Sequence, residues 1–368
     1  MKRNILYVVR SLDVGGLEQV VIDLANHIDK ARYRSYICCI ARAGELARNV
    51  QDRDSLFVIG NEGRVNIGSM KYLHDLVRRH AIDLVHPHNL PGLFYVYPAA
   101  KCARVPIVYT LHGYHRREEI FIFRFLEKVM SRSVDRFVCV SKELLPRAQR
   151  AFGVSGKKMC VIHNGIEGTS APRGETRERD QNVIIGSVGR VTYLKNYELL
   201  IEAFSDVLKI RPSCRLEIVG DGEVFGRIAG LVKALSLDEC VTLHGAQLDV
   251  DRYLARFDIF ALSSISEGHS IAVLEALRLK KVCVVSAVGG NSEIIADGLN
   301  GYLFESGNKA DLVRKLVFVI DNLHTPEMDR IRQQAVETIR SKFSREQMVV
   351  AYEHVYRELL GDRAAGAP

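Results

Sequence analysis

Two glutamates eight residues apart, Glu267 and Glu275, stand in the segment SEGHSIAVLEAL. Glu267 follows a strand-like apolar run, and Glu275 lies inside a stretch with helical periodicity. Eight helical residues rise about 12 Å and return to nearly the same face. This is wider than the roughly 5–9.5 Å between the two carboxyls of a glycosidase. The spacing favours binding of two hydroxyl-bearing sugars on one long ligand. An exposed Glu followed by a Glu that the helix dipole stabilises is the alternative.

The junction after Glu267 is rich in hydrogen-bond donors. Gly268, His269, Ser270 and Ile271 connect the strand-like run to the helix-like stretch. Backbone N–H groups at the start of a helix attract anions, and small residues allow a ligand to approach them. We therefore expect this junction to contact the polar part of the ligand.

Arg190 and Lys195 lie in GRVTYLKN, between another strand-like run and the next helix-like stretch. Two cations five residues apart on a loop can converge on one diphosphate. Taken alone, such a pair more often lies on the solvated surface without binding a ligand. Its position directly after the first strand of a second domain favours binding of a diphosphate.

Gly15 and Gly16 precede the helix-like segment LEQVVIDLA. A double glycine there allows backbone N–H groups to contact an anion, and a tight strand–helix turn is the equal alternative. The pair does not belong to a G-x-G-x-x-G motif, which disfavours a dinucleotide-dependent dehydrogenase.

His112 follows the strand-like PIVYT and precedes Gly113. A histidine at the end of a strand, beside a flexible residue, is a candidate for a functional role, although most single histidines are structural. His88, in VHPHN, is open to either interpretation.

No metal site is expected. Asp249 and Asp251 form an Asp-x-Asp of the kind that elsewhere holds a divalent metal, but an aspartate here would cap the following helix. The sequence has no zinc-like Cys/His cluster. Its eight cysteines lack a C-x-x-C pair, and several lie in apolar runs, so we expect reduced core thiols in a cytosolic protein.

Short apolar runs alternate with helix-like segments along most of the chain. This pattern predicts parallel strands in doubly wound sheets. The first group of expected strands is 5–9, 35–40, 56–59, 82–86, 106–110, 136–140 and 159–162. The second group is 182–188, 214–220, 240–244, 258–263 and 281–286. Two further helices are expected at about 326–340 and at the C-terminus.

A polar segment without periodicity, 167–182, separates the two groups and is expected to be a linker. The 368 residues therefore predict two Rossmann-like domains, 1–166 and 183–343, with a C-terminal helix in 344–368. Ligands of such sheets bind at the carboxyl ends of the strands, where the candidate residues of both domains stand.

The charge is uneven. Residues 1–165 hold 26 Lys and Arg against 15 Asp and Glu, a net of +11, and the remainder has −4 of the total +7. The basic first half indicates an anionic surface partner, with drift in surface composition as the alternative.

The segment 115–136 mixes basic and apolar residues and could dock on anionic lipid, or could be an ordinary helix. No apolar run approaches the ~20 residues of a membrane span. The N-terminal run is too short for a signal peptide.

Taken together, these segments resemble the GT-B nucleotide-sugar glycosyltransferases, specifically the large retaining family 4. The resemblance covers nearly the whole chain. The Glu-x7-Glu segment followed by VGGNSEIIADGLNGYLF is its most specific part. The other matching strings are GGLE, TLHG, CVSK, VIHNGI, SVGRVTYLKN, IVGDGE and LHG.

The resemblance implies a GT-B fold, in which two Rossmann-like domains face each other across a cleft and the C-terminal helix returns to the first domain. It assigns to the donor site Gly15, Gly16, Arg190, Lys195, Gly268, His269, Ser270, Ile271 and Glu275. It assigns to catalysis His112, Arg190, Lys195 and Glu267. Gly290, Asn291 and Glu293 match a loop that supports the donor, although the position of Asn291 is commonly proline in that motif.

The implied reaction transfers a hexose from a UDP-, GDP- or ADP-sugar to a glycan or lipid-linked acceptor, with retention and without metal or another cofactor. Surface polysaccharide or glycolipid synthesis, in the cytoplasm or at the inner face of the membrane, is the implied setting, and no nucleic acid is expected. A nucleotide-sugar epimerase of the same fold and a non-catalytic nucleotide-sugar-binding protein remain alternatives.

Overall fold

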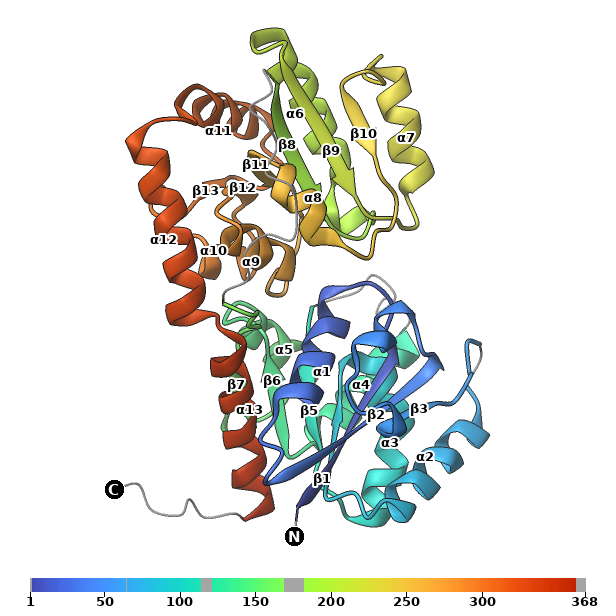
Figure 1. Ribbon diagram of the computed structural model, residues 1–368. Coiled ribbons are helices and arrows are strands. Elements are labelled where there is room, and N and C mark those ends of the chain that lie inside the picture. Colours follow the sequence, from blue (N-terminus) through green and yellow to red (C-terminus); the bar gives the residue numbers. More distant parts are fainter. Residues whose placement is uncertain (1, 64, 114–120, 169–181, 362–368) are drawn as a thin grey trace, which may run out of the picture. The chain divides into compact units, whose positions relative to one another are not determined.

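The computed structural model describes residues 2–63, 65–113, 121–168 and 182–361. The chain forms two compact units (Figure 1). Unit 1 contains residues 1–164 and 345–368, and unit 2 contains residues 165–344. The linker expected at 167–182 lies almost wholly outside the described residues.

Unit 1 has a parallel sheet whose strands follow the order β3-β2-β1-β4 and, separately, β5-β6-β7. Parallel bridges from Val85 to Ile107 and from His88 to Thr110 join the two parts. The strands β3-β2-β1-β4-β5-β6 therefore have the Rossmann order, which reverses direction between β1 and β4. The strands are β1 (Arg3–Ser11), β2 (Tyr33–Arg42), β3 (Leu56–Val58), β4 (Leu84–Pro87), β5 (Val108–Leu111), β6 (Arg136–Cys139) and β7 (Met159–Val161).

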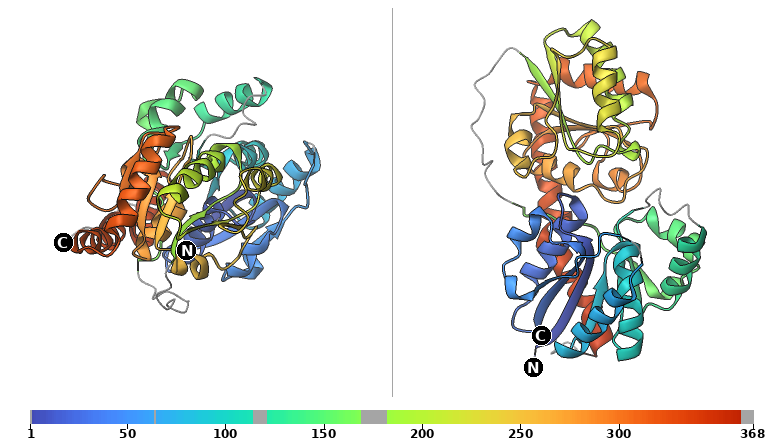
Figure 2. Two further views of the ribbon diagram at one scale, coloured as in Figure 1. Left: turned by 90° about the horizontal axis from the view of Figure 1, so that it is seen from above. Right: turned by 90° about the vertical axis from the view of Figure 1, so that its right-hand side faces the viewer.

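Helices cover both faces of this sheet, and α1 and α3 lie on opposite sides of its first strands (Figure 2). Because both faces are covered, the central strands are continuous apolar runs, such as the fully buried Ile5 to Val9 of β1. The helices of this part of the chain are α1 (Gly16–His27), α2 (Ile67–Arg79), α3 (Asn89–Ala103), α4 (Phe121–Arg132) and α5 (Leu144–Phe152).

The C-terminal helix α13 (Arg345–Leu360) belongs to unit 1 although it follows unit 2 in the sequence. Its Tyr356 hydroxyl lies 2.6 Å from His86 Nδ1, and its Tyr352 hydroxyl lies 3.2 Å from Thr110 Oγ1. All four side chains are buried. Burial lowers the pKa of His86 well below its usual value, so the ring stays neutral and needs these hydrogen bonds.

Unit 2 has a second parallel sheet, in the order β10-β9-β8-β11-β12-β13. This is again the Rossmann order, and it reverses direction between β8 and β11. The strands are β8 (Val183–Val188), β9 (Cys214–Val219), β10 (Val241–Leu243), β11 (Ile259–Leu262), β12 (Val282–Ser286) and β13 (Tyr302–Phe304). The short β13 was not among the strands expected from the sequence.

The helices of unit 2 are α6 (Tyr197–Ile210), α7 (Phe225–Ala234), α8 (Val250–Arg256), α9 (Ile271–Arg278), α10 (Asn291–Ile294), α11 (Lys309–Asn322) and α12 (Pro326–Lys342). Two of them begin with a polar cap: Asn308 and Thr325 accept hydrogen bonds from backbone N–H groups in the first turns of α11 and α12.

Replacement of Tyr356 by Phe should destabilise unit 1. The change removes one hydroxyl and leaves the buried His86 Nδ1 without this partner, which should cost about 1–3 kcal/mol of unfolding free energy. Urea denaturation followed by circular dichroism measures the loss. Tyr72→Phe, at a side chain that is 39% exposed, is the matched control and should change little. Equal midpoints for the two variants would contradict the role given to the Tyr356 hydroxyl.

Candidate functional site

The candidate residues of unit 2 follow two adjacent strands, β8 and β11, on either side of the point where the strand order reverses. Arg190 and Lys195 come after β8, and Glu267 to Ile271 come after β11. Loops diverge at such a reversal and leave a crevice for a ligand at the carboxyl ends of the strands. The fold therefore brings together, within one unit, residues about 70 positions apart in the sequence.

Lys195 and Glu267 form an ion pair. Lys195 Nζ lies 2.6 Å from Glu267 Oε1, and the same oxygen accepts a hydrogen bond from Ser264 Oγ at 2.6 Å. The two charged side chains are only 19% and 10% exposed. Water screens such a pair weakly, so each charge holds the other in place. Ser264 was not among the predicted site residues, although its position directly after β11 is a signal that could have identified it.

The loop that carries Lys195 is also held through its backbone. Ser263 Oγ donates to the carbonyls of Lys195 and Asn196, at 3.1 and 2.8 Å. The Ile265 N–H donates to the Leu194 carbonyl at 2.8 Å. These bonds join the loop after β8 to the loop after β11, so the ammonium group stands on a fixed backbone.

Glycines allow the neighbouring loops to pack backbone against backbone. A Cβ on Gly220 would lie 2.0 Å from the Gly189 carbonyl oxygen, and one on Gly222 would lie 2.4 Å from that of Val191. A Cβ on Gly290 would lie 2.2 Å from the Gly268 carbonyl oxygen. Real side chains do not approach so closely, so only glycine fits at these positions. The loops that carry Arg190 and Glu267 are each supported in this way.

The junction after Glu267 differs from a continuous helix. Helix α9 begins at Ile271, with Ser270 at its N-cap, so Glu267 is in the preceding loop and Glu275 is in the second turn. The separation of about 12 Å expected from helical rise is therefore not supported, because only part of the segment is helical. The side chain of His269 is buried, with its ring centroid 5.0 Å from that of Phe343, so any contact of His269 with a ligand would be through its backbone.

The remaining candidates of this unit lie at the same edge of the sheet. Arg190 is exposed and follows Gly189 in the loop after β8. Glu275 is half-buried on α9. Asn291 begins α10 and is fully buried, and its Nδ2 donates to the Ser286 carbonyl at 3.2 Å. A proline could not make this bond, so the asparagine is accommodated by a contact of its own.

In unit 1 the double glycine is at the expected place. Gly15 is extended, and α1 begins at Gly16. The chain leaves β1 here, beside the reversal between β1 and β4. Gly15 and Gly16 are therefore at the same carboxyl edge as the residues that follow β4 and β5.

Three residues at that edge contact one another. His88 Nδ1 lies 2.8 Å from His112 Nε2. Asn89 Oδ1 accepts a hydrogen bond from the His112 backbone N–H at 3.0 Å. Burial, together with His86 and His112, lowers the pKa of His88 well below its usual value, so this ring is neutral near pH 7. The pairing of His88 with His112 was not anticipated, because the two residues are 24 positions apart on different strands.

The Asp-x-Asp motif has structural roles in this chain. Asp249 accepts a hydrogen bond from the Arg252 N–H and caps α8, which confirms the capping interpretation. Asp251 pairs with Arg278 of α9 at 2.6 Å. Among the described residues, no group of three or more His, Cys, Asp or Glu side chains is arranged to hold a metal ion. All eight cysteines are unbonded thiols.

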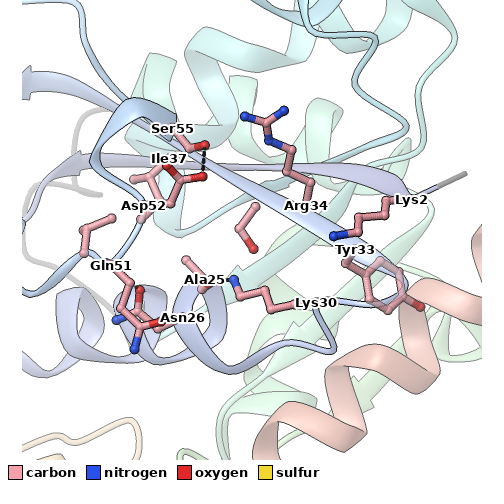
Figure 3. Close-up of a pocket in the computed structure, with 12 residues that line it drawn as sticks. Lys2, Ala25, Asn26, Lys30, Tyr33, Arg34, Ile37, Gln51, Asp52 and Ser55 are labelled. Carbon is pink, nitrogen blue, oxygen red and sulfur yellow. Dashed lines mark hydrogen bonds between the residues drawn. The ribbon is translucent and has the colours of Figure 1, made fainter.

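A cavity of about 420 Å³ lies elsewhere in unit 1, near the amino ends of β1 and β2 (Figure 3). Lys2, Lys30 and Asp52 are among its lining residues, and the Ser55 hydroxyl donates to Asp52. Arg34 also borders it, but its guanidinium lies over the Tyr36 ring. The cavity is thus at the edge of the sheet opposite to Gly15, Gly16 and His112, and it holds none of the candidate residues.

Comparison with known families accounts for most of the chain. Residues 14–168 match the model of Glycosyltransferase Family 4, and residues 170–338 match the model of Glycosyl transferases group 1. Within the described residues, no helix is both long and apolar enough to span a bilayer.

Individual proteins give a consistent result. The chain is 31% identical to the O-antigen biosynthesis glycosyltransferase WbnH of Escherichia coli, over 67% of this chain and 68% of that protein. It is 26% identical to the UDP-Gal:alpha-D-GlcNAc-diphosphoundecaprenol alpha-1,3-galactosyltransferase of Escherichia coli, over 69% and 70% of the two chains. The crystal structure of Anabaena HepE in complex with UDP and glucose aligns with 97% of this chain and 100% of its own, at a TM-score of 0.84 and 20% identity. This last likeness concerns the fold.

Replacement of Gly290 by Ala should destabilise unit 2, because the new Cβ would meet the Gly268 carbonyl. Overpacking of this kind costs about 1–3 kcal/mol. Gly230→Ala is the matched control: Gly230 lies within α7 and a Cβ there would meet no atom within 4 Å, so alanine should leave stability unchanged or raise it by about 0.5–1 kcal/mol. Denaturation midpoints in urea compare the two. A Gly290 variant as stable as the control would show that the loops do not depend on this contact.

Proposed function

The chain belongs to the family 4, group 1 glycosyltransferases, and on that premise we propose that it transfers a hexose from a nucleotide-sugar donor to a glycan or lipid-linked acceptor, with retention and without a metal ion. The two curated relatives described above are named for O-antigen synthesis and for transfer to a diphosphoundecaprenol-linked sugar. They support a role in surface polysaccharide or glycolipid synthesis.

One observation carries the proposal: a lysine and a glutamate meet at the carboxyl end of the unit 2 sheet, with an exposed arginine on the same loop as the lysine. Lys195 and Glu267 are 2.6 Å apart and largely shielded from water. A ligand with an anionic diphosphate and a hydroxyl-rich sugar complements both charges. The diphosphate would bind Lys195 and Arg190, and the sugar hydroxyls would donate hydrogen bonds to Glu267.

The other site residues have matching proposed roles. Glu275 would hold the ribose, and the backbone of Gly268 to Ile271 would contact the transferred sugar. In unit 1, the N–H of Gly16, preceded by Gly15, would contact the donor phosphate. His112 would lie near the sugar at the reacting carbon.

The proposed chemistry is same-face substitution at the anomeric carbon. The acceptor oxygen bonds to that carbon, the bond to the phosphate oxygen breaks, and the acceptor proton passes to the departing phosphate. Negative charge grows on the diphosphate as it leaves, so fixed cations lower the barrier most. Two protein cations could supply this stabilisation without a metal ion.

Donor choice is tested by a thermal-shift panel of UDP-, GDP- and ADP-sugars in the presence of EDTA. The preferred donor is then incubated with lipid-linked acceptors, and the products are examined by mass spectrometry and anomeric NMR. A retained linkage formed in EDTA supports the proposal, and an inverted linkage or a requirement for divalent metal contradicts it. Conversion of the donor without acceptor would instead indicate an epimerase. Binding without turnover of any acceptor would favour a non-catalytic binding protein.

Lys195→Ala and Arg190→Ala should each slow transfer. Loss of one cation from the leaving group should raise the barrier by about 2–4 kcal/mol, roughly a 30- to 1000-fold fall in kcat. Initial rates at saturating donor measure the effect. Lys209→Ala is the control, since this lysine is 73% exposed and pairs with Asp206 on the surface. Unchanged turnover in both site variants would refute the assignment of the cations.

We also propose that unit 1 contacts the inner face of the cell membrane from the cytoplasm. Most of the described part of the segment 115–136 forms α4, in which Phe125 and Val129 are 53% and 48% exposed, one turn apart. Lys128 and Arg132 lie on the same helix. Exposed apolar side chains flanked by cations suit an anionic bilayer surface. The part of the segment at 115–120 lies outside the described residues.

The double variant Phe125→Ser, Val129→Ser should therefore bind phosphatidylglycerol vesicles roughly tenfold more weakly or worse, because it removes two apolar side chains from the interface. Vesicle co-sedimentation measures the partition. Ile210→Ser in unit 2 removes an apolar side chain that is 48% exposed and should have no effect. Equal binding of all these proteins, or no binding of the parent, would overturn the membrane proposal while leaving the transfer reaction untouched.

A further inference from the structure

His112 is held at two points by consecutive residues of another strand end. Its ring Nε2 lies 2.8 Å from His88 Nδ1, with the two rings stacked at 28° and their centroids 5.1 Å apart. Its backbone N–H donates to Asn89 Oδ1 at 3.0 Å. A ring fixed through its nitrogen and a backbone fixed through its amide leave His112 little freedom of position.

Asn89 makes its contact from a left-handed backbone conformation. Its φ of 56° is in a region that few residues other than glycine adopt, and asparagine is one of those few. The asparagine therefore suits this position twice: its backbone tolerates the left-handed conformation, and its side chain reaches the His112 amide.

The pair also determines where the His112 proton resides. Neutral His88 carries one N–H, and among the described residues its buried Nε2 has no hydrogen-bond partner. A buried N–H without an acceptor is rarer and costlier than an unfilled lone pair. The proton of His88 therefore resides on Nδ1 and is donated to His112 Nε2. A neutral His112 must then carry its own proton on Nδ1.

We propose that His88 and Asn89 are positioning residues: Asn89 fixes the backbone of His112, and His88 fixes its ring in the tautomer with the proton on Nδ1, so that an N–H donor is presented to the transferred sugar or its acceptor. The last step rests on the function proposed above for His112. The tautomer itself does not, because it follows from contacts within unit 1.

The remainder of the network supports this geometry. His86 lies on β4, two residues before His88, and its ring centroid lies 4.2 Å from that of His88. Its two nitrogens contact the hydroxyls of Tyr356 and Thr110, at 2.6 and 2.7 Å. The ring beneath His88 is thus fully hydrogen-bonded, and it supports His88 without competing for the nitrogen that faces His112.

The first test is spectroscopic and needs no substrate. Long-range ¹H–¹⁵N correlation spectra of protein labelled at histidine, assigned with His112→Gln, report the tautomer of His112 at pH 7.5. We expect the Nδ1–H form in the parent. His88→Leu should release the ring to a mixture that includes the Nε2–H form. His88→Asn should keep the Nδ1–H form, because the asparagine amide can donate in place of the imidazole.

The second test is kinetic. His88→Leu should lower kcat about 10- to 100-fold, by analogy with the loss of the hydrogen-bond partner of a metal-bound histidine, with KM for the donor changed far less. His88→Asn should recover most of the loss. Asn89→Gly keeps the backbone conformation but removes Oδ1, and it should also lower kcat. Ser236→Gly, at an exposed residue with φ 55°, is its matched control.

Nucleotide binding and melting temperature are measured on every variant, so that misfolding is recognised. If His88→Leu does not fold, the tautomer in the parent spectrum and the activity of His88→Asn still test the proposal. An Nε2–H tautomer in the parent, or a folded His88→Leu enzyme with kcat within twofold of the parent, would overturn the proposal. An Nδ1–H tautomer in a protein that transfers no sugar would leave the positioning intact and refute the proposed function instead.

Discussion

The close approach of loop backbones at the carboxyl edge of the unit 2 sheet is the constraint on which its candidate site depends. Gly220 and Gly222 support the loop after β8, and Gly289 and Gly290 support the loop after β11. A Cβ at any of the four would lie within 2.4 Å of a carbonyl oxygen. Because no side chains separate the loops, Lys195 and Glu267 are placed by covalent geometry and hydrogen bonds rather than by adjustable packing.

This rigidity explains how two opposite charges can face each other while shielded from water. A partly buried ion pair is stabilising only when its geometry is good and its remaining hydrogen-bonding capacity is filled. Ser264 fills part of that capacity on Glu267. A ligand that brings both negative charge and hydroxyl groups can replace each half of the pair with an equivalent contact. The pairing of the two charges is therefore compatible with binding and keeps both side chains in place before a ligand arrives.

The sequence was most informative where a pattern is local. Apolar runs separated by helix-like segments predicted most strands of both units, because buried parallel strands are continuous apolar segments. The three-residue β13 was not predicted, because Tyr302 to Phe304 follows Gly298, Asn300 and Gly301, a composition typical of loops. The estimated separation of Glu267 and Glu275 lost its basis for a related reason: helical spacing was extended over a loop, whereas α9 begins only at Ile271. The contact of His88 with His112 joins two strands, and no pattern in a single sequence reports such a pair.

The strand register of unit 1 connects the C-terminal helix α13 to the carboxyl edge of the unit 1 sheet. Successive side chains on a strand alternate between faces, so His86 and His88 share a face of β4, and Thr110 shares a face with His112 beyond the end of β5. Tyr356 and Tyr352 of α13 hydrogen-bond to His86 and Thr110, the inner members of these pairs. A slip of β4 by one residue would carry both histidines to the opposite face and break the hydrogen bonds of His86 to Tyr356 and Thr110. The bond from Tyr356 of α13 to His86 thus favours the register in which His88 meets His112, so a helix at the end of the chain supports the candidate site at these two histidines.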